Sequence, residues 1–181
     1  MFNTDRFVSD CIDAIAKDKS HKAVREILDR AVSDPASVLE GLGEPTVGGV
    51  QKLHVSDTLT ILNVVWPAWM TIRPHNHEMW AVIGIYSGRE DNTFWRRIPN
   101  ADGGKIEAAG ANAMCVKDTA PLGADIIHSV NNPIPRLTGA IHVYGGNFFE
   151  EPRLEWDAET LLEGPYDVAK NMRAFDEFGA R

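Results

Sequence analysis

The chain has 181 residues and a formal net charge of −8, with 44% hydrophobic and 24% charged residues. This length and composition favour one globular domain with a sizeable core. The negative charge argues against nucleic-acid binding, because phosphates would repel the chain and no basic stripe offsets that repulsion. The two cysteines, Cys11 and Cys115, lack CxxC spacing, which argues against a disulfide framework and favours a reducing compartment.

The sequence predicts neither export nor membrane insertion. The first twenty residues, MFNTDRFVSDCIDAIAKDKS, mix acidic with apolar side chains, which is unlike a signal peptide. No apolar run approaches the roughly 20 residues that span a bilayer. We therefore expect a soluble, cytoplasmic protein with no membrane partner, and the sequence leaves a homodimer open.

The first 45 residues have the pattern of helices. Apolar residues recur at i, i+3 and i+4 through residues 7–15 and again through 23–31. In SDPASVLEGLG, Asp34 is a candidate N-cap and Pro35 suits the first helical position. These signals predict three short helices in an N-terminal segment, residues 1–45.

From about residue 48 the sequence changes to short segments rich in β-branched and aromatic residues, such as LTILNVVW and WAVIGIY, separated by turn-forming residues. Eight or nine such segments follow without a helix between them up to about residue 150, which indicates an antiparallel sandwich or barrel. The C-terminal extension, 151–181, favours a helix over DAETLLEG, capped by Asp157, and another over 167–178. We expect these parts to form a single domain, 1–181.

Two histidines, His75 and His77, stand just before the apolar run in RPHNHEMWAVIG. Alternate residues of a strand share a face, so both imidazoles would point the same way. Such a pair is by itself more often structural than metal-binding. A third histidine, His128, lies in APLGADIIHSVNN, after a Pro-x-Gly turn and four residues before Asn132. The three histidines together predict a metal site built from two strands.

These two stretches resemble the two sequence motifs of the cupin superfamily, G-x5-HxH-x3,4-E-x6-G and G-x5-PxG-x2-H-x3-N. The resemblance implies a mainly β fold, the cupin double-stranded β-helix or jelly-roll barrel, with an N-terminal helical segment. The sequence departs from the pattern at the glutamate, which would fall at Ala81 or Val82. The implied ligand set is three neutral imidazoles without a carboxylate, which would leave positions open for an anionic substrate and dioxygen.

The stretch HNHEMWAVIGIYSGRE also resembles the signature H-x-H-x-x-W-[GA]-x-x-G-x-x-x-G-x-E of bacterial thiol dioxygenases, the cysteine dioxygenase-like family. This resemblance covers about residues 48–157. It implies an Fe(2+)-dependent enzyme that oxidises a small thiol, cysteine or a 3-mercaptopropionate-like compound, to its sulfinate with O2. It also implies that His75, His77 and His128 bind the iron. In AIHVYGG, His142 and Tyr144 match the family's catalytic His-x-Tyr pair beside the iron.

The sequence also departs from the cysteine dioxygenase-like family at two positions. Ala140 stands where the family has a serine two residues before the histidine of the His-x-Tyr pair. Val82 stands where the mammalian enzymes carry a cysteine crosslinked to the tyrosine, so that crosslink cannot form here. The hydrogen-bond relay that the family builds from Ser, His and Tyr is therefore expected to lack one member.

Three residues are candidate substrate contacts. The family binds the substrate carboxylate with an Arg or a Gln on an early strand, and Gln51 lies near that position. Arg73 has the strand parity of the HxH histidines and would suit a carboxylate bidentately, although a salt bridge at the barrel mouth is an equally good interpretation. Trp80, which belongs to the signature, is a candidate wall of the substrate pocket.

Two other functions stay open at this level. The chain could be a cupin metalloenzyme, a dioxygenase or a hydrolase, that acts on a non-thiol small carboxylate. It could also be a non-catalytic metal-binding cupin. The family resemblance favours the thiol dioxygenase, whose partners would be a small-molecule thiol and O2.

Overall fold

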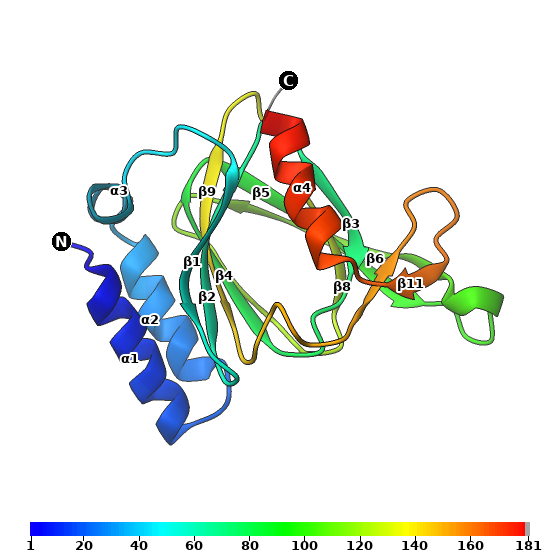
Figure 1. The fold of residues 1–181 in the computed structure, drawn as a ribbon, viewed down its shortest axis with the longest axis horizontal. Helices are drawn as coiled ribbons and strands as arrows, with labels where there is room; N and C mark the ends of the chain where they lie inside the picture. Colours follow the sequence, from blue (N-terminus) through cyan, green and yellow to red (C-terminus); the bar gives the residue numbers. More distant parts are fainter. Residues whose placement is uncertain (180–181) are drawn as a thin grey trace.

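The computed structural model describes residues 1–179 (Figure 1). Three helices come first: α1 (Thr4–Lys17), α2 (Lys22–Val32) and α3 (Pro35–Leu42). The strands that follow are β1 (Gly49–Val55), β2 (Thr60–Trp66), β3 (Thr71–His75), β4 (Ala81–Ser87), β5 (Arg89–Arg97), β6 (Ile106–Cys115), β7 (Thr119–Leu122), β8 (Ile127–Asn131) and β9 (Thr138–Tyr144). A short 3-10 turn, η1 (Asp102–Gly104), joins β5 to β6, and the chain ends with β10 (Leu154–Trp156), β11 (Glu163–Pro165) and α4 (Val168–Gly179).

The strands form two antiparallel sheets that face each other. One sheet has the order β1-β2-β9-β4-β7, and the other has the order β11-β10-β3-β8-β5-β6. Figure 1 shows the two sheets enclosing a common interior, with α1 and α2 outside the first sheet. This arrangement confirms the expected mainly β barrel with helices at its N-terminal end.

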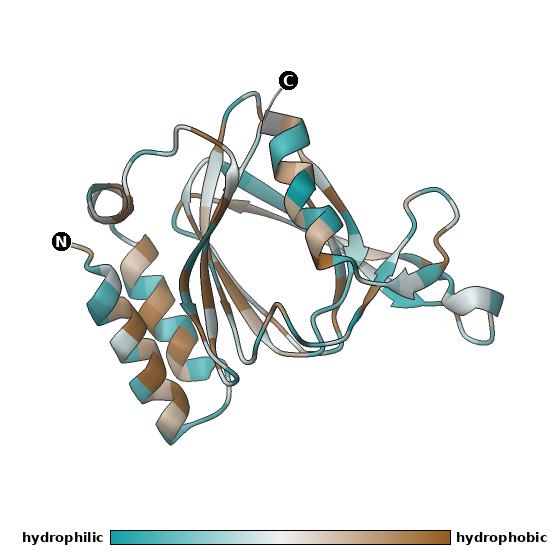
Figure 2. Cartoon of the chain, in the orientation of Figure 1, coloured by the Kyte–Doolittle hydropathy of each residue, from teal (hydrophilic) through white to brown (hydrophobic). Residues whose placement is uncertain are grey.

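Strand β4 shows why the central strands of the first sheet are apolar on both faces. Ala81, Ile83 and Ile85 face the barrel interior, whereas Val82 and Tyr86 face the helices. A strand buried on both sides needs a continuous apolar run rather than an alternating one. Figure 2 shows the matching brown stripes where α1 and α2 face this sheet.

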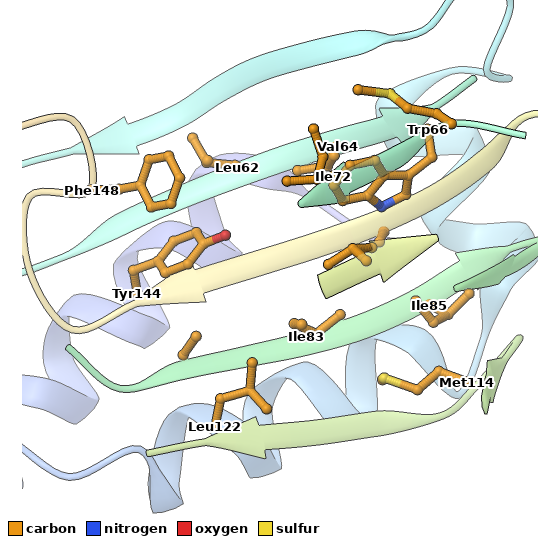
Figure 3. Packing of buried hydrophobic residues seen from close by; sticks show 14 of the residues in the cluster. Leu62, Val64, Trp66, Ile72, Ile83, Ile85, Met114, Leu122, Tyr144 and Phe148 are labelled. Carbon is orange, nitrogen blue, oxygen red and sulfur yellow. The ribbon is translucent and has the colours of Figure 1, made fainter. Parts of the chain in front are cut away.

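The barrel interior is filled by a single apolar cluster (Figure 3). Leu62 and Val64 come from β2, Ile72 comes from β3, and Tyr144 with Phe148 closes one end. Burial of apolar area at about 25 cal/mol per Å² makes this cluster and the helix-facing cluster the main sources of stability.

Asn132 closes the turn after β8, as its place in the second cupin motif suggests. Its side chain is fully buried, and its amide donates to the carbonyls of Trp66, Pro67 and Arg136 at 3.1, 2.9 and 2.8 Å. Its carbonyl oxygen accepts from the hydroxyl of Thr138 at 3.2 Å. An amide that satisfies four partners fixes this end of the barrel.

The C-terminal extension differs in part from the expectation. Residues 157–164 do not form a helix: Asp157 caps a single turn through the backbone N–H of Thr160, and the chain then enters β11. The helix expected over 167–178 is present as α4, which packs Phe175 and Met172 against the barrel interior. In residues 1–179, no helix is both long and apolar enough to cross a membrane.

Candidate metal centre

Three buried histidine side chains converge inside the barrel. Nε2 of His77 lies 3.2 Å from Nε2 of His75 and 3.3 Å from Nε2 of His128. All three side chains are at most 5% exposed, and their candidate ligand atoms lie within 4.8 Å of one another. Among residues 1–179 this is the one group of His, Cys, Asp or Glu that could hold a metal ion.

The backbone brings two of these histidines together by strand pairing. His75 ends β3 and pairs directly with His128 on β8. His77 lies beyond the strand and so does not share a strand face with His75, but the two imidazoles do point to the same centre as the sequence predicts. The chain turns between them because Asn76 bonds to the backbone of Leu154, its side-chain oxygen accepting from that N–H at 2.8 Å. Glu78 then takes a left-handed backbone conformation with a φ of 56°.

Hydrogen bonds at Nδ1 orient two of the imidazoles. His75 Nδ1–H donates to the carbonyl of Arg73 at 3.0 Å, and His128 Nδ1–H donates to Oδ1 of Asn92 at 2.6 Å. A carbonyl can only accept, so in each ring the proton sits on Nδ1. The Nε2 lone pairs of both rings therefore point toward the common centre, as ligation requires.

Burial keeps the three imidazoles neutral. It lowers the pKa of His75 to about 4, and the positive charge of Arg153 adds to this effect. Burial lowers the pKa of His77 and His128 well below the usual histidine value, and neighbouring histidines add to the shift. Neutral imidazole is the form that binds a metal, so the site is ready for ligation at neutral pH.

The separations of the nitrogens fit a single divalent metal. With metal–nitrogen bonds of about 2.1 Å, a nitrogen–nitrogen distance near 3.2 Å corresponds to a ligand–metal–ligand angle of about 100°. His75, His77 and His128 are thus close enough together to hold one ion between them. The glutamate of the cupin motif is replaced by Ala81, which faces the interior beside Tyr144, whereas Val82 faces the helices.

Tyr144 and His142 lie next to the three histidines on β9. The ring centroid of Tyr144 is 5.1 Å from that of His77. Its hydroxyl is 3.1 Å from Nδ1 of His142, and Nε2 of His142 is 3.2 Å from Oε2 of Glu90. Burial raises the pKa of Tyr144, so its phenol stays protonated at neutral pH.

A small cavity adjoins the histidines. Its volume is about 40 Å³, which is room for a few water-sized groups. Phe148 and Tyr166 line it near the histidines, and Met172 with Phe175 from α4 covers it. The other lining residues are mostly aliphatic: Val50, Leu62, Val64, Ile72 and Val130. The cavity therefore suits a substrate of few atoms with an apolar body.

Arg73 does not line the cavity. A register shift between Ile72 and His75 interrupts the alternation of β3, so Ile72 and His75 both reach the cavity while Arg73 does not share their face. The guanidinium instead lies 3.5 Å from Glu155 and 3.8 Å from Asp157. The structure thus places Arg73 in a salt bridge, the second of its two sequence interpretations.

Gln51 and Trp80 also lie outside the cavity. Gln51 is exposed on β1 and accepts a hydrogen bond from Asn63 at 3.2 Å. Trp80 faces the helices, where its indole N–H donates to the carbonyl of Lys19 at 2.9 Å. Its role in the structure is to attach the end of α1 to the barrel.

Arg153 does not line the cavity either, but it packs against two residues that do. Its guanidinium carbon lies 4.2 Å from the ring centroids of both Phe148 and Tyr166, which line the cavity. Nη1 donates to the carbonyl of Phe148 at 2.5 Å, but Nε and Nη2 are buried without a hydrogen-bond partner in residues 1–179. Sequence alone ranks it low, since PRLEW carries no spacing that ties it to the histidines.

Comparisons with known proteins give weak structural similarities alone. No protein-family model matches the sequence, and no curated protein matches it. An RmlC-like cupin family protein from Methanocaldococcus jannaschii is 12% identical over 60% of this chain and 88% of its own, with a TM-score of 0.47. Oxalate decarboxylase from Bacillus subtilis is 14% identical over 60% of this chain and 28% of its own, with a TM-score of 0.44. At these identities and TM-scores, the likenesses are too weak to assign a family or an activity.

The fold is a mainly β barrel of two antiparallel sheets with N-terminal helices, as expected from the sequence. Its interior holds a three-histidine group with the burial, tautomers and separations of a metal centre.

Proposed function

We propose that the protein is an Fe(2+)-dependent thiol dioxygenase that converts a small mercapto acid to its sulfinate. The observation that carries the proposal is the set of three neutral imidazoles without a carboxylate, next to the buried Tyr144–His142 pair. The resemblance of HNHEMWAVIGIYSGRE to the bacterial thiol dioxygenase signature supports the same reaction.

In the proposed reaction a thiol, R–SH, and O2 combine to give R–SO2H, so sulfur gains both oxygen atoms. His75, His77 and His128 would hold the iron, which supplies Lewis acidity for the thiolate and redox chemistry for dioxygen. Tyr144 keeps its proton, which it donates to Nδ1 of His142 in the structure, and the same O–H would turn to an oxygen atom beside His77 during the reaction. His142 accepts from that phenol and orients it. The apolar cavity excludes bulk water.

Arg153 is the proposed partner of the substrate carboxylate. Arg153 is 6% exposed, and two of its guanidinium nitrogens have no hydrogen-bond partner in the described residues. Burying these groups costs free energy, which hydrogen bonds to a bound anion would offset. The charge of Arg153 also acts on His75 and His77, so it lies within electrostatic reach of the centre. A thiol with a carboxylate two or three bonds away would bind the metal through its sulfur and Arg153 through its carboxylate.

The cavity favours a mercapto acid without an amino group. The charge of Glu155 acts on His75, but this acid already pairs with Arg73, Lys170 and Asn171. No lining residue in the described part of the chain is acidic, so the ammonium group of cysteine would lack a free anionic partner. Burying an unpaired ammonium group is costly. We therefore expect 3-mercaptopropionate to be a better substrate than cysteine.

The test is an oxygen-electrode screen of protein reconstituted anaerobically with Fe(2+). The substrates are 3-mercaptopropionate, cysteine, cysteamine and mercaptosuccinate. We expect oxygen uptake with 3-mercaptopropionate above that with cysteine, and little with cysteamine, which has no carboxylate. Activity with a non-thiol carboxylate alone would instead favour another cupin metalloenzyme. Stoichiometric zinc in the purified protein, with no uptake after iron is restored, would favour a non-catalytic metal-binding cupin.

The proposed setting is the cytoplasm, where thiol substrates stay reduced. Both cysteines of the chain are free, Cys11 buried and Cys115 exposed.

A further inference from the structure

Glu90, on β5, is a fully buried acid that lies next to the metal centre without facing the cavity. Its Oε2 accepts the indole N–H of Trp66 at 2.7 Å and lies 3.2 Å from Nε2 of His142. Its Oε1 accepts the side-chain amide of Asn92 at 3.0 Å. The indole of Trp66 and the amide nitrogen of Asn92 can only donate, so both oxygens of Glu90 act as hydrogen-bond acceptors.

One of these contacts leads to the metal ligand His128. Because the amide nitrogen of Asn92 points to Glu90, its carbonyl oxygen must point the other way, to Nδ1 of His128 at 2.6 Å. That oxygen accepts the Nδ1 proton and leaves Nε2 of His128 free for a metal. Glu90 and Asn92 share the inward face of β5 because they are two residues apart on the strand.

Another contact leads to Tyr144. Since the carboxylate of Glu90 can only accept, His142 must carry its proton on Nε2. Nδ1 of His142 is then an acceptor, and the hydroxyl of Tyr144 donates to it at 3.1 Å. The contact therefore sets the direction of the hydrogen bond between the tyrosine and the histidine.

We propose that Glu90 is a positioning residue that fixes the tautomers of His128 and His142 with a single carboxylate. Ala140 supplies no hydroxyl to His142, and Glu90 takes the place of that missing partner. The inference rests on the proposed metal site but not on the identity of the substrate. Outer hydrogen-bond partners of this kind change metal affinity by roughly 10- to 100-fold.

The test measures Co(2+) affinity by competition with a chelator, in the absence of thiol and oxygen. Glu90→Gln keeps the shape of the side chain but removes its charge, and we expect the affinity to fall about 10- to 100-fold. Asn92→Leu removes the amide that links Glu90 to His128. When Glu90→Gln is added to Asn92→Leu, the Co(2+) affinity should therefore change by less than about twofold. Such non-additivity is expected of two residues that act through the same contact. Glu107→Gln, at an exposed acid paired with Arg96, is the matched control and should leave the affinity unchanged.

Two results would overturn the proposal. One is a folded Glu90→Gln variant with the affinity of the parent protein. The other is an equal loss in the presence and absence of Asn92→Leu, because the carboxylate would then act by another route. A protein that binds Co(2+) as expected but oxidises no thiol would contradict the proposed function and leave this inference standing.

A measurement on the unsubstituted protein covers the case in which Glu90→Gln does not fold. Nitrogen-15 chemical shifts of the histidine rings in the metal-free protein at neutral pH report the tautomers directly. We expect His128 with its proton on Nδ1 and His142 with its proton on Nε2. The opposite tautomer at either residue would contradict the role assigned to Glu90.

Discussion

At the scale of single residues, the site depends on which nitrogen of each imidazole carries a proton. The carbonyl of Arg73 and the amide oxygen of Asn92 hold the Nδ1 protons of His75 and His128. The paired Nε2 atoms are then free to bind a metal, with no rearrangement of the rings. The three histidines are therefore the proposed metal ligands, whereas Tyr144 lies beside the metal site without being a ligand.

His128→Ala and Tyr144→Phe should therefore have different effects. His128→Ala removes one of three ligands, and we expect the purified protein to lose its bound metal. Tyr144→Phe removes only a hydroxyl, so the protein should keep its iron while turnover falls about 10²-fold or more, as for loss of an acid–base group. Metal analysis and oxygen uptake on both variants check this. Retained iron in His128→Ala would mean that the ligands are assigned incorrectly.

The two arginines near the barrel mouth offer a matched pair of variants. Arg153→Gln should lower kcat/KM for 3-mercaptopropionate by roughly 10- to 100-fold, mainly through KM, because a charge-assisted hydrogen bond contributes about 1.5–3 kcal/mol. Arg73→Gln should leave KM nearly unchanged, since that guanidinium pairs with Glu155 and Asp157. Steady-state kinetics decide, with circular dichroism to check folding. A larger rise in KM for Arg73→Gln than for Arg153→Gln would mean that Arg73 binds the substrate carboxylate.

The spacing of the histidines was enough to predict that His75, His77 and His128 converge, and their binding of a metal stays a prediction. The surroundings of the metal were harder to predict. A bulge in β3 removes Arg73 from the face that simple alternation assigns to it. Arg153 reaches the site through tertiary packing that nothing in its local sequence reports, whereas Glu90 is the last residue of the signature, which marks its position but not its contacts.

At the scale of elements, β4 connects the N-terminal helices to the barrel. Gly84 lies where α2 crosses the strand, and a Cβ atom there would be 2.8 Å from Cγ of Leu28 and 3.0 Å from Cγ1 of Val32. The Trp and Gly of the signature thus serve mainly to seat the helices, Trp80 on Lys19 and Gly84 on α2. The glutamate of the same signature, Glu90, is the residue that reaches the metal site.

Gly84→Ala should destabilise the protein by about 1–3 kcal/mol, because the added methyl group overpacks the contact with α2. Gly110→Ala, on the exposed face of β6, is the matched control: its Cβ would meet no atom within 4 Å, and the change should be close to neutral. Urea denaturation of both variants measures the difference. Equal stability of the two would show that α2 moves freely enough to accept the methyl group.

The elements themselves were largely predictable. Helical periodicity and the Asp34–Pro35 cap predicted α1 to α3, and the turn residues marked most of the strands. The error at DAETLLEG has a local cause. Asp157 can cap a full helix or a single turn equally well. Only one turn forms here, because Glu163–Pro165 pairs with β10. Strand pairing outweighs weak helix propensity there.

At the scale of the whole molecule, folding requires that three imidazoles be buried without charge. Their pKa values are lowered in the folded state, so between about pH 6.5 and pH 4 the unfolded chain binds more protons than the folded chain. The free energy of unfolding of the metal-free protein therefore rises with pH through this window and falls on acidification. The shift of His75 alone corresponds to about 3 kcal/mol.

Chemical denaturation of the metal-free protein across this pH range measures the effect. The control is a triple variant, His75→Gln with His77→Gln and His128→Gln, which has no titrating group at the centre and should show a much flatter dependence. The same slope in both proteins would mean that other groups control the acid sensitivity.

In the proposed function, this barrel transfers both atoms of dioxygen to a thiol sulfur. The most direct measurement is mass spectrometry of the product formed by Fe(2+)-loaded protein from 3-mercaptopropionate under ¹⁸O2. We predict a sulfinate that carries two ¹⁸O atoms, with one O2 consumed for each thiol. A folded protein with a full complement of iron that forms no labelled sulfinate from 3-mercaptopropionate, cysteine, cysteamine or mercaptosuccinate would contradict the account.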